Sequence, residues 1–597
     1  MNSRMVHRGP DDEGVYVDPD CAFAMGARRL SIIDLAGGHQ PIANEDESVW
    51  AVLNGEIYNF QALTDQLRRA GHTFRCATDT EVLVHLYEDY GPELVHALDG
   101  MYAFAIWDAR RRRLLLARDR FGEKPLFYCE QADSLVFASE LTALRAALDS
   151  SPELDGASLD AYLGLGYVPG ARTIFRDIKA LEPAHVLTWS EVAPTPRVSE
   201  YWSMPARPRR PSRSMTDYTE EATVLLRRAV SSRLVADVPV GVLLSGGLDS
   251  SLVARTVADV GGLPLRTFTV TYDVGAVSEA TEAQAMAERL GSQHHEFMLS
   301  SSDVQTRVPA VLSALDQPIG DPALVALHAV SELARQSVTV VLGGEGADEL
   351  FGGYPRYRWL ARAERLATLL PPGVGRLGVR VADLSGHPRA ARLADLVAPT
   401  DTVRRQIDWV ATGLRPVRKS LYGDRLQSAI REDLAVSDAG SVFNNDGRGG
   451  VIGRLMQLDQ RRYLPDDVLA KADRATMQLS LEMRSPFLSR ELAEFSAGIP
   501  AKLHASNGGK AVLRAVSRGM PGMGRKSRAK TAFRVPLAEW LRGPLAALVD
   551  QLPADSRLVR DGWIRGAELR RLTAAHRSGE ANHASAIWTV LAAELCL

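Results

Sequence analysis

A short run of small and polar residues near the middle of the chain has the chemistry of a phosphate-binding site. Ser245-Gly246-Gly247 follows an apolar run, and Asp249 and Ser250 open a helical pattern. Two glycines allow a sharp turn, and the N–H groups at a helix N-terminus bind phosphate. A carboxylate such as Asp249 fits there when a divalent cation bridges it to the phosphates. Gly-Gly alone is typical of any strand-to-helix turn, but the flanking Ser and Asp residues favour a nucleotide held with a divalent cation.

The pattern around this run predicts the elements that hold it. Apolar runs of strand length alternate with helical patterns, which indicates a parallel sheet with crossover helices. The predicted strands are 238–244, 265–271 and 338–342, and the predicted helices are 216–236, 248–260 and 279–290. Beyond residue 355 we expect a mostly helical region. It includes 371–455, to which the sequence assigns no further role.

The N-terminal third differs, because short β-rich runs there alternate with turns and two helical patterns. The expected strands are 48–52, 100–107, 114–117 and 135–138, and the expected helices are 59–70 and 80–90. A segment rich in Pro, Arg and Ser, 207–214, follows this third and is typical of a linker. We therefore expect two domains, 1–205 and 206–597, and we interpret the basic charge of the linker as that of a solvated loop.

Length and composition limit the functional classes. The chain has 597 residues, of which 46% are hydrophobic and 24% charged, as in soluble globular proteins of more than one domain. The formal net charge of −3 gives no electrostatic reason to expect nucleic acid or a membrane as partner. No apolar run has the length of a membrane helix, and the start lacks a signal-peptide pattern. The four cysteines show no disulfide or metal spacing. We expect a cytoplasmic protein with small-molecule substrates.

Six motifs follow one another in the N-terminal third. They are HRGPD, RLSIID, NGEIYN, TDTE, DGMYAF and RDRFG, which begin at residues 7, 29, 54, 78, 99 and 118. Each alone is compatible with an ordinary turn or strand end, and Asn-Gly is a common hairpin turn. In this order they resemble the class II glutamine amidotransferase domain. The resemblance implies an αββα sandwich of the N-terminal-nucleophile (Ntn) hydrolase type, with two sheets between helix layers.

The same resemblance implies a glutamine site. Its members would be Arg29, Leu30, Ser31, Ile32, Ile33, Asn54, Gly55, Glu56 and Asp79. Arg29 would bind the carboxylate of glutamine through its guanidinium. Asn54 and Gly55 would supply the donors of an oxyanion hole. Glu56 and Asp79 would bind the α-amino group.

The chain departs from this family at its start. The family's nucleophile is a cysteine directly after the initiator methionine, whereas this chain begins Met1-Asn2-Ser3 and reaches HRGPD by residue 7. None of its four cysteines stands at the nucleophile's place, and we interpret them as small hydrophobic residues. Two explanations remain open: a true start farther upstream, or an enzyme that uses free ammonia. We expect that the chain as printed does not hydrolyse glutamine.

The C-terminal two-thirds resembles glutamine-hydrolysing asparagine synthetases. The motifs that carry the resemblance include SGGLDSS, GGEGADELFGGY, KADR, LEMRSPFL and GK, which begin at residues 245, 343, 471, 481 and 509, with Lys530 and Phe533 farther on. The resemblance implies an adenine nucleotide α-hydrolase-like (PP-loop) domain of ATP-pyrophosphatase type. It also implies the residues that contact ATP, which are Leu243, Ser245, Gly246, Gly247, Asp249, Ser250, Val270, Gly343 and Gly344.

The resemblance also implies catalytic and metal-binding residues. Asp249 and Asp348 would hold Mg²⁺. Glu345 would act in forming and using an acyl-adenylate, which includes a role as general base, and Lys510 would stabilise the charged transition state. Lys471 remains open between a phosphate contact and a pairing with Asp467 or Asp473. The adjacent His294 and His295 point apart on a strand, so we interpret them as structural.

These residues together predict an ATP-dependent amide-forming ligase. The side-chain carboxylate of aspartate would attack the α-phosphate of ATP, pyrophosphate would leave, and ammonia would displace AMP to give asparagine. The ammonia would come from glutamine, or from solution where the nucleophile is lacking, and a homodimer is possible. Two alternatives stay open: a related cyclase of the β-lactam synthetase or lasso-peptide type acting on another carboxylate, and an inactive nucleotide-binding relative.

Overall fold

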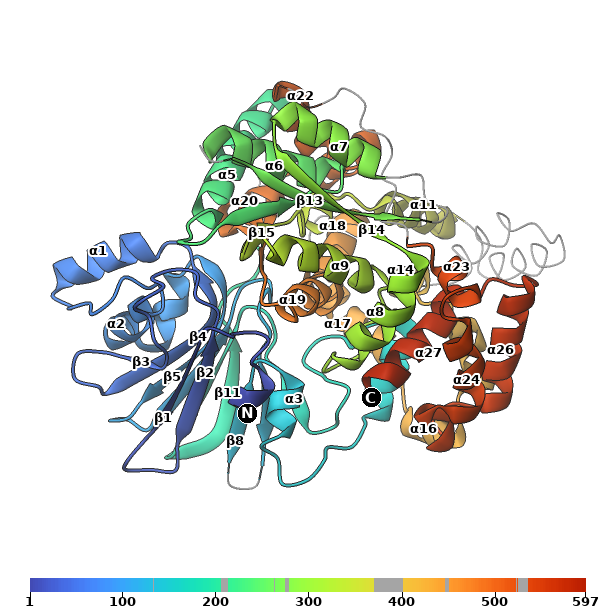
Figure 1. The fold of residues 1–597 in the computed structure, drawn as a ribbon, viewed down its shortest axis with the longest axis horizontal. Coiled ribbons are helices and arrows are strands. Elements are labelled where there is room, and N and C mark those ends of the chain that lie inside the picture. Colours follow the sequence, from blue (N-terminus) through green and yellow to red (C-terminus); the bar gives the residue numbers. More distant parts are fainter. Residues whose placement is uncertain are drawn as a thin grey trace.

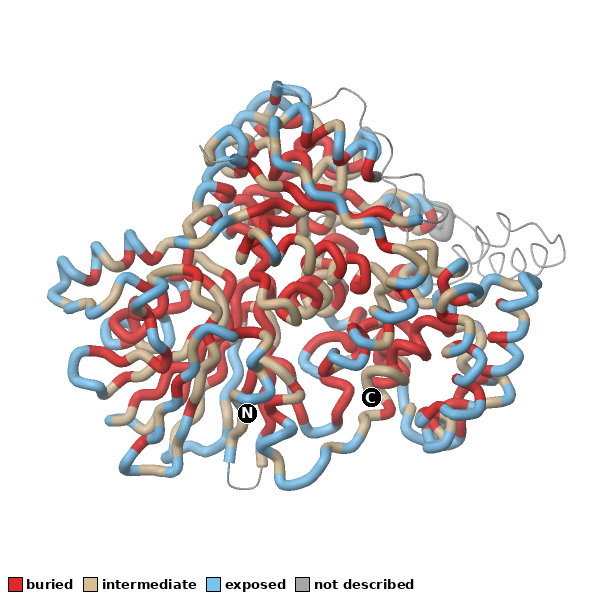
Figure 2. Tube along the Cα trace, viewed as in Figure 1, coloured by how far each residue is buried: buried red, intermediate tan, exposed pale blue. Residues whose placement is uncertain are grey.

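The protein is described by a computed structural model that covers 1–131, 134–205, 213–261, 264–273, 279–369, 401–445, 450–521, 523 and 535–597. Figure 1 shows an N-terminal domain of antiparallel strands beside a larger domain built on a parallel sheet. The last helices of the chain pack at the far side of this second domain. Buried residues run continuously through both domains (Figure 2), so the two parts share one compact body. No helix of the described residues is long and apolar enough to cross a membrane.

The N-terminal domain contains a six-stranded antiparallel sheet with the order β11-β10-β6-β5-β4-β3. Its strands are β3 (Ile42–Ala43), β4 (Val49–Ile57), β5 (Gly100–Asp108), β6 (Arg113–Arg118), β10 (His185–Ser190) and β11 (Ala193–Glu200). One face is covered by α1 (Phe60–Ala70) and α2 (Glu81–Tyr90), whose apolar residues join those of β4 and β5 in one core cluster. Both helices confirm the predicted 59–70 and 80–90 to within one residue at either end.

The other face of this sheet packs against two smaller sheets. One is the hairpin of β1 (Asp12–Val17) and β2 (Ala24–Arg29), and the other has the order β8-β7-β9. The second small sheet consists of β7 (Phe127–Glu130), β8 (Leu135–Ala138) and β9 (Ile178–Ala180). The helices α3 (Leu141–Arg145) and α4 (Gly156–Leu165) pack behind it. Two sheet layers thus lie between helices, with the second layer split.

The C-terminal domain is built on a five-stranded sheet in which every pairing is parallel, with the order β14-β13-β12-β15-β16. Its strands are β12 (Val240–Leu243), β13 (Arg266–Tyr272), β14 (Gln293–Leu299), β15 (Val340–Leu342) and β16 (Glu482–Arg484). The three predicted strands are confirmed as β12, β13 and β15. The strand expected around His294 and His295 is the edge strand β14, whose bounds were not predicted because it carries polar residues at mostly exposed positions, and β16 was not predicted because it has only three residues.

Helices cover both faces of the parallel sheet, as crossover connections require. The helices α5 (Met215–Arg233), α6 (Leu248–Val260) and α7 (Glu279–Leu290) confirm the predicted set, and their apolar residues share one core cluster. On the other face lie α8 (Ser301–Ser313), α9 (Ala323–Arg335) and α19 (Ala470–Met477). The β12-to-α6 connection is therefore a strand–loop–helix unit, and it contains the 245–250 segment.

The region beyond residue 355 is mostly helical, as predicted, and β16 is the strand within its described residues. A separate core cluster joins α11 (Pro355–Leu369), α14 (Thr402–Val410), α17 (Leu434–Asn445) and α18 (Gly450–Leu458). The last part contains α22 (Ala511–Gly519), α23 (Leu537–Arg542), α24 (Ala546–Asp555), α26 (Gly566–Ser578) and α27 (Ala584–Cys596). Residues 206–212, which make up most of the predicted linker, lie outside the described residues, as do 371–400, Lys530 and Phe533.

Candidate active sites

The 245–250 loop lies at the carboxyl end of β12, the central strand of the parallel sheet. Ser245 and Ser250 join their hydroxyl oxygens at 3.0 Å, and the N–H of Gly247 donates to Ser245 Oγ at 3.3 Å. Gly246 has φ = +72°, and a Cβ there would lie 2.7 Å from the backbone nitrogen of Ala283. Glycine is therefore required at this turn, which directs the first N–H groups of α6 toward the loop.

The predicted second loop, GGEGADE, begins directly after β15, the parallel neighbour of β12. A Cβ on Gly344 would lie 3.0 Å from Cβ of Asp249, so the two loops are in contact. Leu243 ends β12 and the buried Val270 lies on β13, both at the same edge of the sheet. Parallel strands present their carboxyl ends at one edge, which is where α/β sheets bind ligands. The fold thus brings the predicted ATP-contacting residues together.

Glu345 carries a carboxyl group at this edge whose ionisation lies near neutral pH. Burial raises its pKa to about 7, against the opposing charge of Lys471. Its Oε2 atom is buried and accepts no hydrogen bond from the described residues. A Cβ on Gly343 would lie 2.1 Å from this same oxygen, so glycine at 343 leaves it room. A partly buried carboxyl with such a pKa is suited to proton transfer.

Lys510 lies between the two carboxylates that were predicted to hold Mg²⁺. Its ammonium group forms an ion pair with Asp348 at 2.7 Å and another with Asp249. Burial alone would lower the pKa of Lys510, but the two carboxylates outweigh that effect and raise it. The backbone of Lys510 is left-handed, with φ = +55°, immediately before α22. A Cβ on Gly353 would lie 2.3 Å from Cε of Lys510, so glycine there makes room for the lysine.

Lys471 pairs with neither of the two aspartates that the sequence offered. Its ammonium group instead forms an ion pair with Asp321, which precedes α9. Burial would lower the pKa of Lys471, but Asp321 and Asp467 together raise it. Asp473 is turned toward the N-terminal domain. His294 donates to or accepts from Thr267 Oγ1 at 2.8 Å on the neighbouring strand, which fits the structural role expected for it.

A cavity of about 690 Å³ lies in the N-terminal domain, between its sheets and facing the second domain. Eight of the nine predicted glutamine-site residues line it, and Ser31 is the exception. The lining ones are Arg29, Leu30, Ile32, Ile33, Asn54, Gly55, Glu56 and Asp79. Residues 1–3 also line the cavity, whereas none of the four cysteines is among its lining residues. The described wall of this cavity therefore holds no thiol.

The polar groups of this cavity already have protein partners. The Arg29 guanidinium donates to the carbonyls of Ile33, Asp34 and Gly37 at 2.7 to 2.8 Å, which folds the 33–37 loop around it. Asn54 donates its amide to Ser139 Oγ at 3.2 Å. Gly55 has φ = +134°, and a Cβ there would lie 2.0 Å from the Met101 carbonyl oxygen, so no other residue fits.

Glu56 connects this cavity to the parallel sheet. Burial, reinforced by neighbouring Asp79, raises the pKa of Glu56 well above its usual range. Its Oε1 lies 3.2 Å from a guanidinium nitrogen of Arg484, a residue of β16 in the other domain. The Arg484 carbonyl accepts a hydrogen bond from the N–H of Gly343 at 2.9 Å. One residue thus contacts both predicted sites, through its side chain and its backbone.

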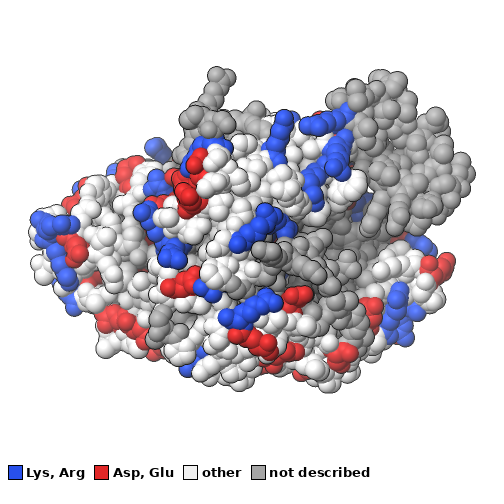
Figure 3. All heavy atoms as spheres, turned by 90° about the horizontal axis from the view of Figure 1, so that it is seen from above, with Lys and Arg blue, Asp and Glu red and all other residues white. Residues whose placement is uncertain are grey.

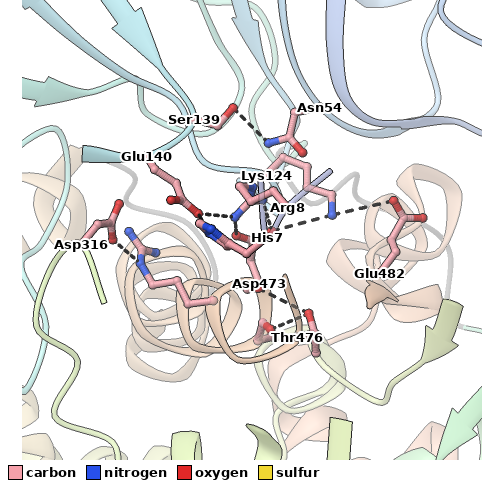
Figure 4. A network of polar contacts seen from close by, with 12 residues as sticks. His7, Arg8, Asn54, Lys124, Ser139, Glu140, Asp316, Asp473, Thr476 and Glu482 are labelled. Atoms are coloured by element: carbon pink, nitrogen blue, oxygen red, sulfur yellow. Dashed lines mark hydrogen bonds and ion pairs between the residues drawn. The ribbon is translucent and has the colours of Figure 1, made fainter. Parts of the chain in front are cut away.

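A second polar network lies across the same domain boundary (Figure 4). Arg8 donates two hydrogen bonds to the Asp473 carboxylate, at 2.8 and 2.9 Å, and a third to Glu140 at 3.2 Å. Lys124 lies 3.7 Å from Asp473 and 4.0 Å from Glu482. All of these groups are buried or nearly so. These buried charges contrast with the outer surface. On the face drawn in Figure 3, acidic and basic side chains are interspersed among uncharged ones.

Comparison with known proteins agrees with this arrangement. A family model described as Asparagine synthase matches residues 221–597. The glutamine-hydrolyzing asparagine synthetase 1 of Bacillus subtilis is 33% identical, over 99% of this chain and 92% of its own length. The chain belongs to the asparagine synthetase family. A second model, described as Glutamine amidotransferase domain, matches residues 1–202.

Other members of the asparagine synthetase family match almost as much of the chain. A putative glutamine-hydrolyzing asparagine synthetase of Mycobacterium tuberculosis is 32% identical, over 98% of this chain and 91% of its own length. A protein named amidase chry2, from Gibberella zeae, is 27% identical, over 94% of this chain and 88% of its own length. The architecture therefore also occurs in a relative whose name refers to another activity.

Sequence reasoning overlooked the residues that join the two domains of this asparagine synthetase family member. Arg484 lies inside the LEMRSPFL motif and Arg8 inside HRGPD, but neither was given a role. Asp321, the partner of Lys471, lies outside the motifs named above. Arg484 in the buried LEMRSPFL segment was the available signal, whereas HRGPD, with exposed residues at 10 and 11, gave none for Arg8. Charges of this kind are found buried mainly when they are paired.

Proposed function

We propose that this chain is an ATP-dependent amide-forming ligase that converts aspartate to asparagine, AMP and pyrophosphate with ammonia as the nitrogen donor. The observation that carries the proposal is the convergence of the 245–250 loop, Glu345 and Lys510 at the carboxyl ends of β12 and β15. An acyl adenylation needs neutralised phosphate charge and little covalent help from the protein. This edge supplies helix N–H donors, hydroxyls and a buried ammonium for that task.

In the first half of the proposed reaction, a carboxylate oxygen of aspartate attacks the α-phosphorus of ATP and the bond to the β-phosphate breaks. The N–H groups of Gly246 and Gly247 and the hydroxyls of Ser245 and Ser250 would bind the pyrophosphate as it leaves. Lys510 would face the charge that develops on the phosphates. Leu243, Val270, Gly343 and Gly344 would contact the adenosine part.

Asp249 and Asp348 would hold Mg²⁺ in this proposal. The residues fit, because two carboxylates that already share one buried positive charge on Lys510 form a hard-oxygen site of the right sign. A bound Mg²⁺ would neutralise phosphate charge. Lys510 must then move its ammonium group away from at least one carboxylate, toward the nucleotide phosphates.

In the second half, ammonia attacks the acyl carbon, AMP leaves, and the nitrogen gives up one proton. Glu345 would accept that proton, since its carboxyl is partly buried and its pKa lies near 7. The N-terminal domain would deliver ammonia from its cavity, which lies on the other side of Arg484. We place the boundary of the two domains at 205/206, a position supported by the end of β11 at Glu200 and by the Pro- and Arg-rich composition that follows.

The chain as printed would take free ammonia, because no thiol lines the cavity in which glutamine would bind. We propose that the cavity residues Arg29, Asn54 and Gly55 belong to the glutamine site. Glu56 would be held by Arg484 and by neighbouring Asp79. A form that carries a cysteine nucleophile ahead of these residues would use glutamine.

A second candidate is the same adenylation with a different carboxylate, including an internal ring closure. The similarity to the amidase chry2 favours it. The same edge of the sheet supports both reactions, since the ATP-contacting groups do not depend on the acceptor.

The test is pyrophosphate release by the full chain with ATP and Mg²⁺, with aspartate present or absent and with ammonium or glutamine as nitrogen donor. We expect release and asparagine formation with aspartate plus ammonium, and no asparagine with glutamine alone. Pyrophosphate release with another carboxylate but not with aspartate would assign the second candidate. No release with any carboxylate would reject both.

A further inference from the structure

Four potential metal ligands meet on the outer side of the N-terminal domain, away from both proposed sites. Glu45 lies in the turn between β3 and β4, and His72 follows the end of α1. His85 and Glu88 lie three residues apart on one face of α2. One ligand atom from each of the four lies within 4.8 Å of all the others. We call these residues the α2 cluster, and none of them lines the 690 Å³ cavity.

The nitrogen–oxygen distances within the α2 cluster are close to those between neighbouring ligand atoms of a bound metal ion. His85 Nδ1 lies 3.3 Å from Glu88 Oε2 and 3.4 Å from Glu45 Oε2. His72 Nδ1 lies 3.6 Å from Glu88 Oε2 and 3.8 Å from Glu45 Oε1. Ligand atoms at 2.0 to 2.1 Å from a tetrahedral zinc ion are roughly 3.3 Å apart. The four ligand atoms lie within 4.8 Å of one another, so binding a cation requires the side chains to draw together toward that separation of roughly 3.3 Å.

Each histidine of the α2 cluster has a carboxylate behind it. His72 Nε2 is hydrogen-bonded to Asp89 Oδ1 at 3.3 Å, on the side away from Glu45 and Glu88. His85 Nε2 faces Glu81 Oε1 at 3.8 Å. A hydrogen bond such as that of His72 to Asp89 fixes the tautomer and the ring orientation of a metal-bound histidine, whereas the 3.8 Å contact of His85 Nε2 is too long for a hydrogen bond. Nδ1 of both rings is directed at the same two glutamates.

The two glutamates of the cluster are also oriented from behind. Glu45 Oε1 accepts the N–H of Thr73 at 2.8 Å, and Glu88 Oε1 accepts the side-chain amide of Asn44 at 2.9 Å. His85 is fully buried and packs against the ring of Phe74 at 4.5 Å, whereas Glu45 and Glu88 are exposed. The cluster thus has a rigid inner side and an outer side open to solvent.

The chemistry of the four donors selects the class of cation. Two imidazoles and two carboxylates suit Zn²⁺ and other divalent first-row transition metals, whereas Mg²⁺ and Ca²⁺ prefer oxygen donors alone. The alternative is a set of ordinary ion pairs between protonated histidines and glutamates. Ordinary ion pairs would not need two Nδ1 atoms to converge on the same carboxylates, and they would not need a further carboxylate behind each ring. Both features are present, which favours the metal site.

We propose that the α2 cluster is a transition-metal site that binds one Zn²⁺ through Glu45, His72, His85 and Glu88. The bound ion would join the β3–β4 turn, the end of α1 and the middle of α2, three segments far apart in the sequence. This inference is independent of the proposed ligase reaction, because it concerns a different part of the molecule.

The test measures zinc bound to the full chain after chelator treatment, by titration against a chromophoric chelator. We expect one tight site that is lost in the double variant Glu45→Gln/His72→Gln, both of whose residues are at least partly exposed. His96→Gln is the matched control, since this exposed histidine forms an ordinary pair with Glu93 at 3.1 Å. It should leave the stoichiometry unchanged. Circular dichroism verifies that each variant is folded, and the single Glu88→Gln variant replaces any that is not.

A second measurement separates this site from adventitious binding. Asp89→Asn removes the carboxylate behind His72 without removing a ligand, so we expect affinity to fall by about 10-fold or more while stoichiometry stays at one. Co²⁺ in place of Zn²⁺ should give the visible absorption of a tetrahedral complex, absent in the double variant. Zinc binding that persists unchanged in the double variant, for example at Asp249 and Asp348, would overturn the proposal, as would the absence of any tight site.

Discussion

The carboxyl group of Glu345 shows how the environment of a single residue sets its chemistry. Burial and the nearby carboxylates of Glu349 and Asp249 raise its pKa, and Lys471 limits the rise. The result, about 7, places the group near the operating pH of a general base. The sequence could predict that a glutamate stands here, from the GGEGADE motif, but not its ionisation, which also depends on Asp249 and Lys471 from two other segments.

The pH dependence of ammonia-dependent synthesis should follow Glu345. Because the base must be ionised, we expect the rate to rise with pH through a midpoint near 7. Glu345→Gln should lower the rate about 100-fold or more and remove this limb of the profile. Initial rates of AMP formation between pH 5.5 and 8.5 measure both effects.

The contribution of Glu345 to the free energy of unfolding should fall as pH rises, whereas the rate of synthesis should increase. The folded protein keeps the Glu345 proton between pH 4.5 and about 7, where the unfolded chain has released it, so this group's contribution to stability falls as pH rises through that window. Glu345→Gln should remove this decline. The exposed Glu332, which pairs with Arg307 at 2.7 Å, offers Glu332→Gln as the control. An unchanged pH–rate profile in Glu345→Gln would exclude the assigned role.

Lys510 should control the affinity of its two aspartates for Mg²⁺. In Lys510→Met the carboxylates of Asp249 and Asp348 lose the ammonium group that they share. We expect tighter Mg²⁺ binding in the absence of ATP, because the competing positive charge is gone, together with a loss of synthesis of about 100-fold or more. Calorimetric titration with Mg²⁺ measures the first effect and AMP formation the second. Mg²⁺ binding that weakens instead would show that the aspartates do not form the metal site.

At the scale of elements, β16 is the segment whose role the sequence least revealed. It has three residues, all buried, and lies at the edge of the parallel sheet beside β15. The Arg484 side chain leaves this strand to contact Glu56 at 3.2 Å and Glu482 at 2.8 Å, and it donates to the carbonyls of Arg233 and Val235. A strand this short carries too few residues for periodicity to identify it.

Loss of the Arg484 guanidinium should destabilise the protein strongly. In Arg484→Met the Glu482 carboxylate remains buried without that charge and Glu56 loses its guanidinium partner, and we expect a cost of about 3 to 5 kcal/mol. Urea unfolding measures it. Arg490→Met is the matched control, since Arg490 forms an exposed pair with Glu494 at 2.9 Å, and its loss should cost less than about 1 kcal/mol. Equal effects of the two variants would contradict this account of the bridge.

The other elements were predictable to the extent that their residues alternate or repeat. The helices α1, α2, α5 and α6 and the three central strands β12, β13 and β15 follow from apolar periodicity and from the turn residues between them. The edge strand β14 did not, because its polar face hides the pattern. Placement of the motifs was predictable as well, since carboxyl ends of parallel strands meet at one edge. Their side-chain partners were not, because most lie more than 100 residues away.

For the whole molecule, the domain boundary is a packed and charged interface. Arg8 and Asp473 form a bidentate pair across it, and Leu141 donates its N–H to Asp316 at 2.8 Å. One hydrophobic cluster also includes residues of α3, α4, α9 and α27. Interfaces of this kind hold domains in a fixed relation, whereas small polar ones permit relative motion.

Cutting the chain between the domains should therefore leave them associated. With a protease site introduced in 206–212, we expect both fragments to elute together on size-exclusion chromatography at moderate salt. Adding Arg8→Met should promote dissociation, because the Asp473 carboxylate then stays buried without its partner. Arg112→Met, which removes an exposed pair with Glu191, is the control. Fragments that separate without any interface substitution would show that the boundary is weak.

The position of Arg484 has a consequence for how the family can diversify. Its side chain contacts Glu56, which lines the N-terminal cavity, and its backbone accepts a hydrogen bond from Gly343 of the proposed nucleotide site. A substitution of Arg484 that alters one of the two proposed sites is therefore expected to alter the other as well. Substitutions that leave β16 unchanged avoid this coupling between the two proposed sites.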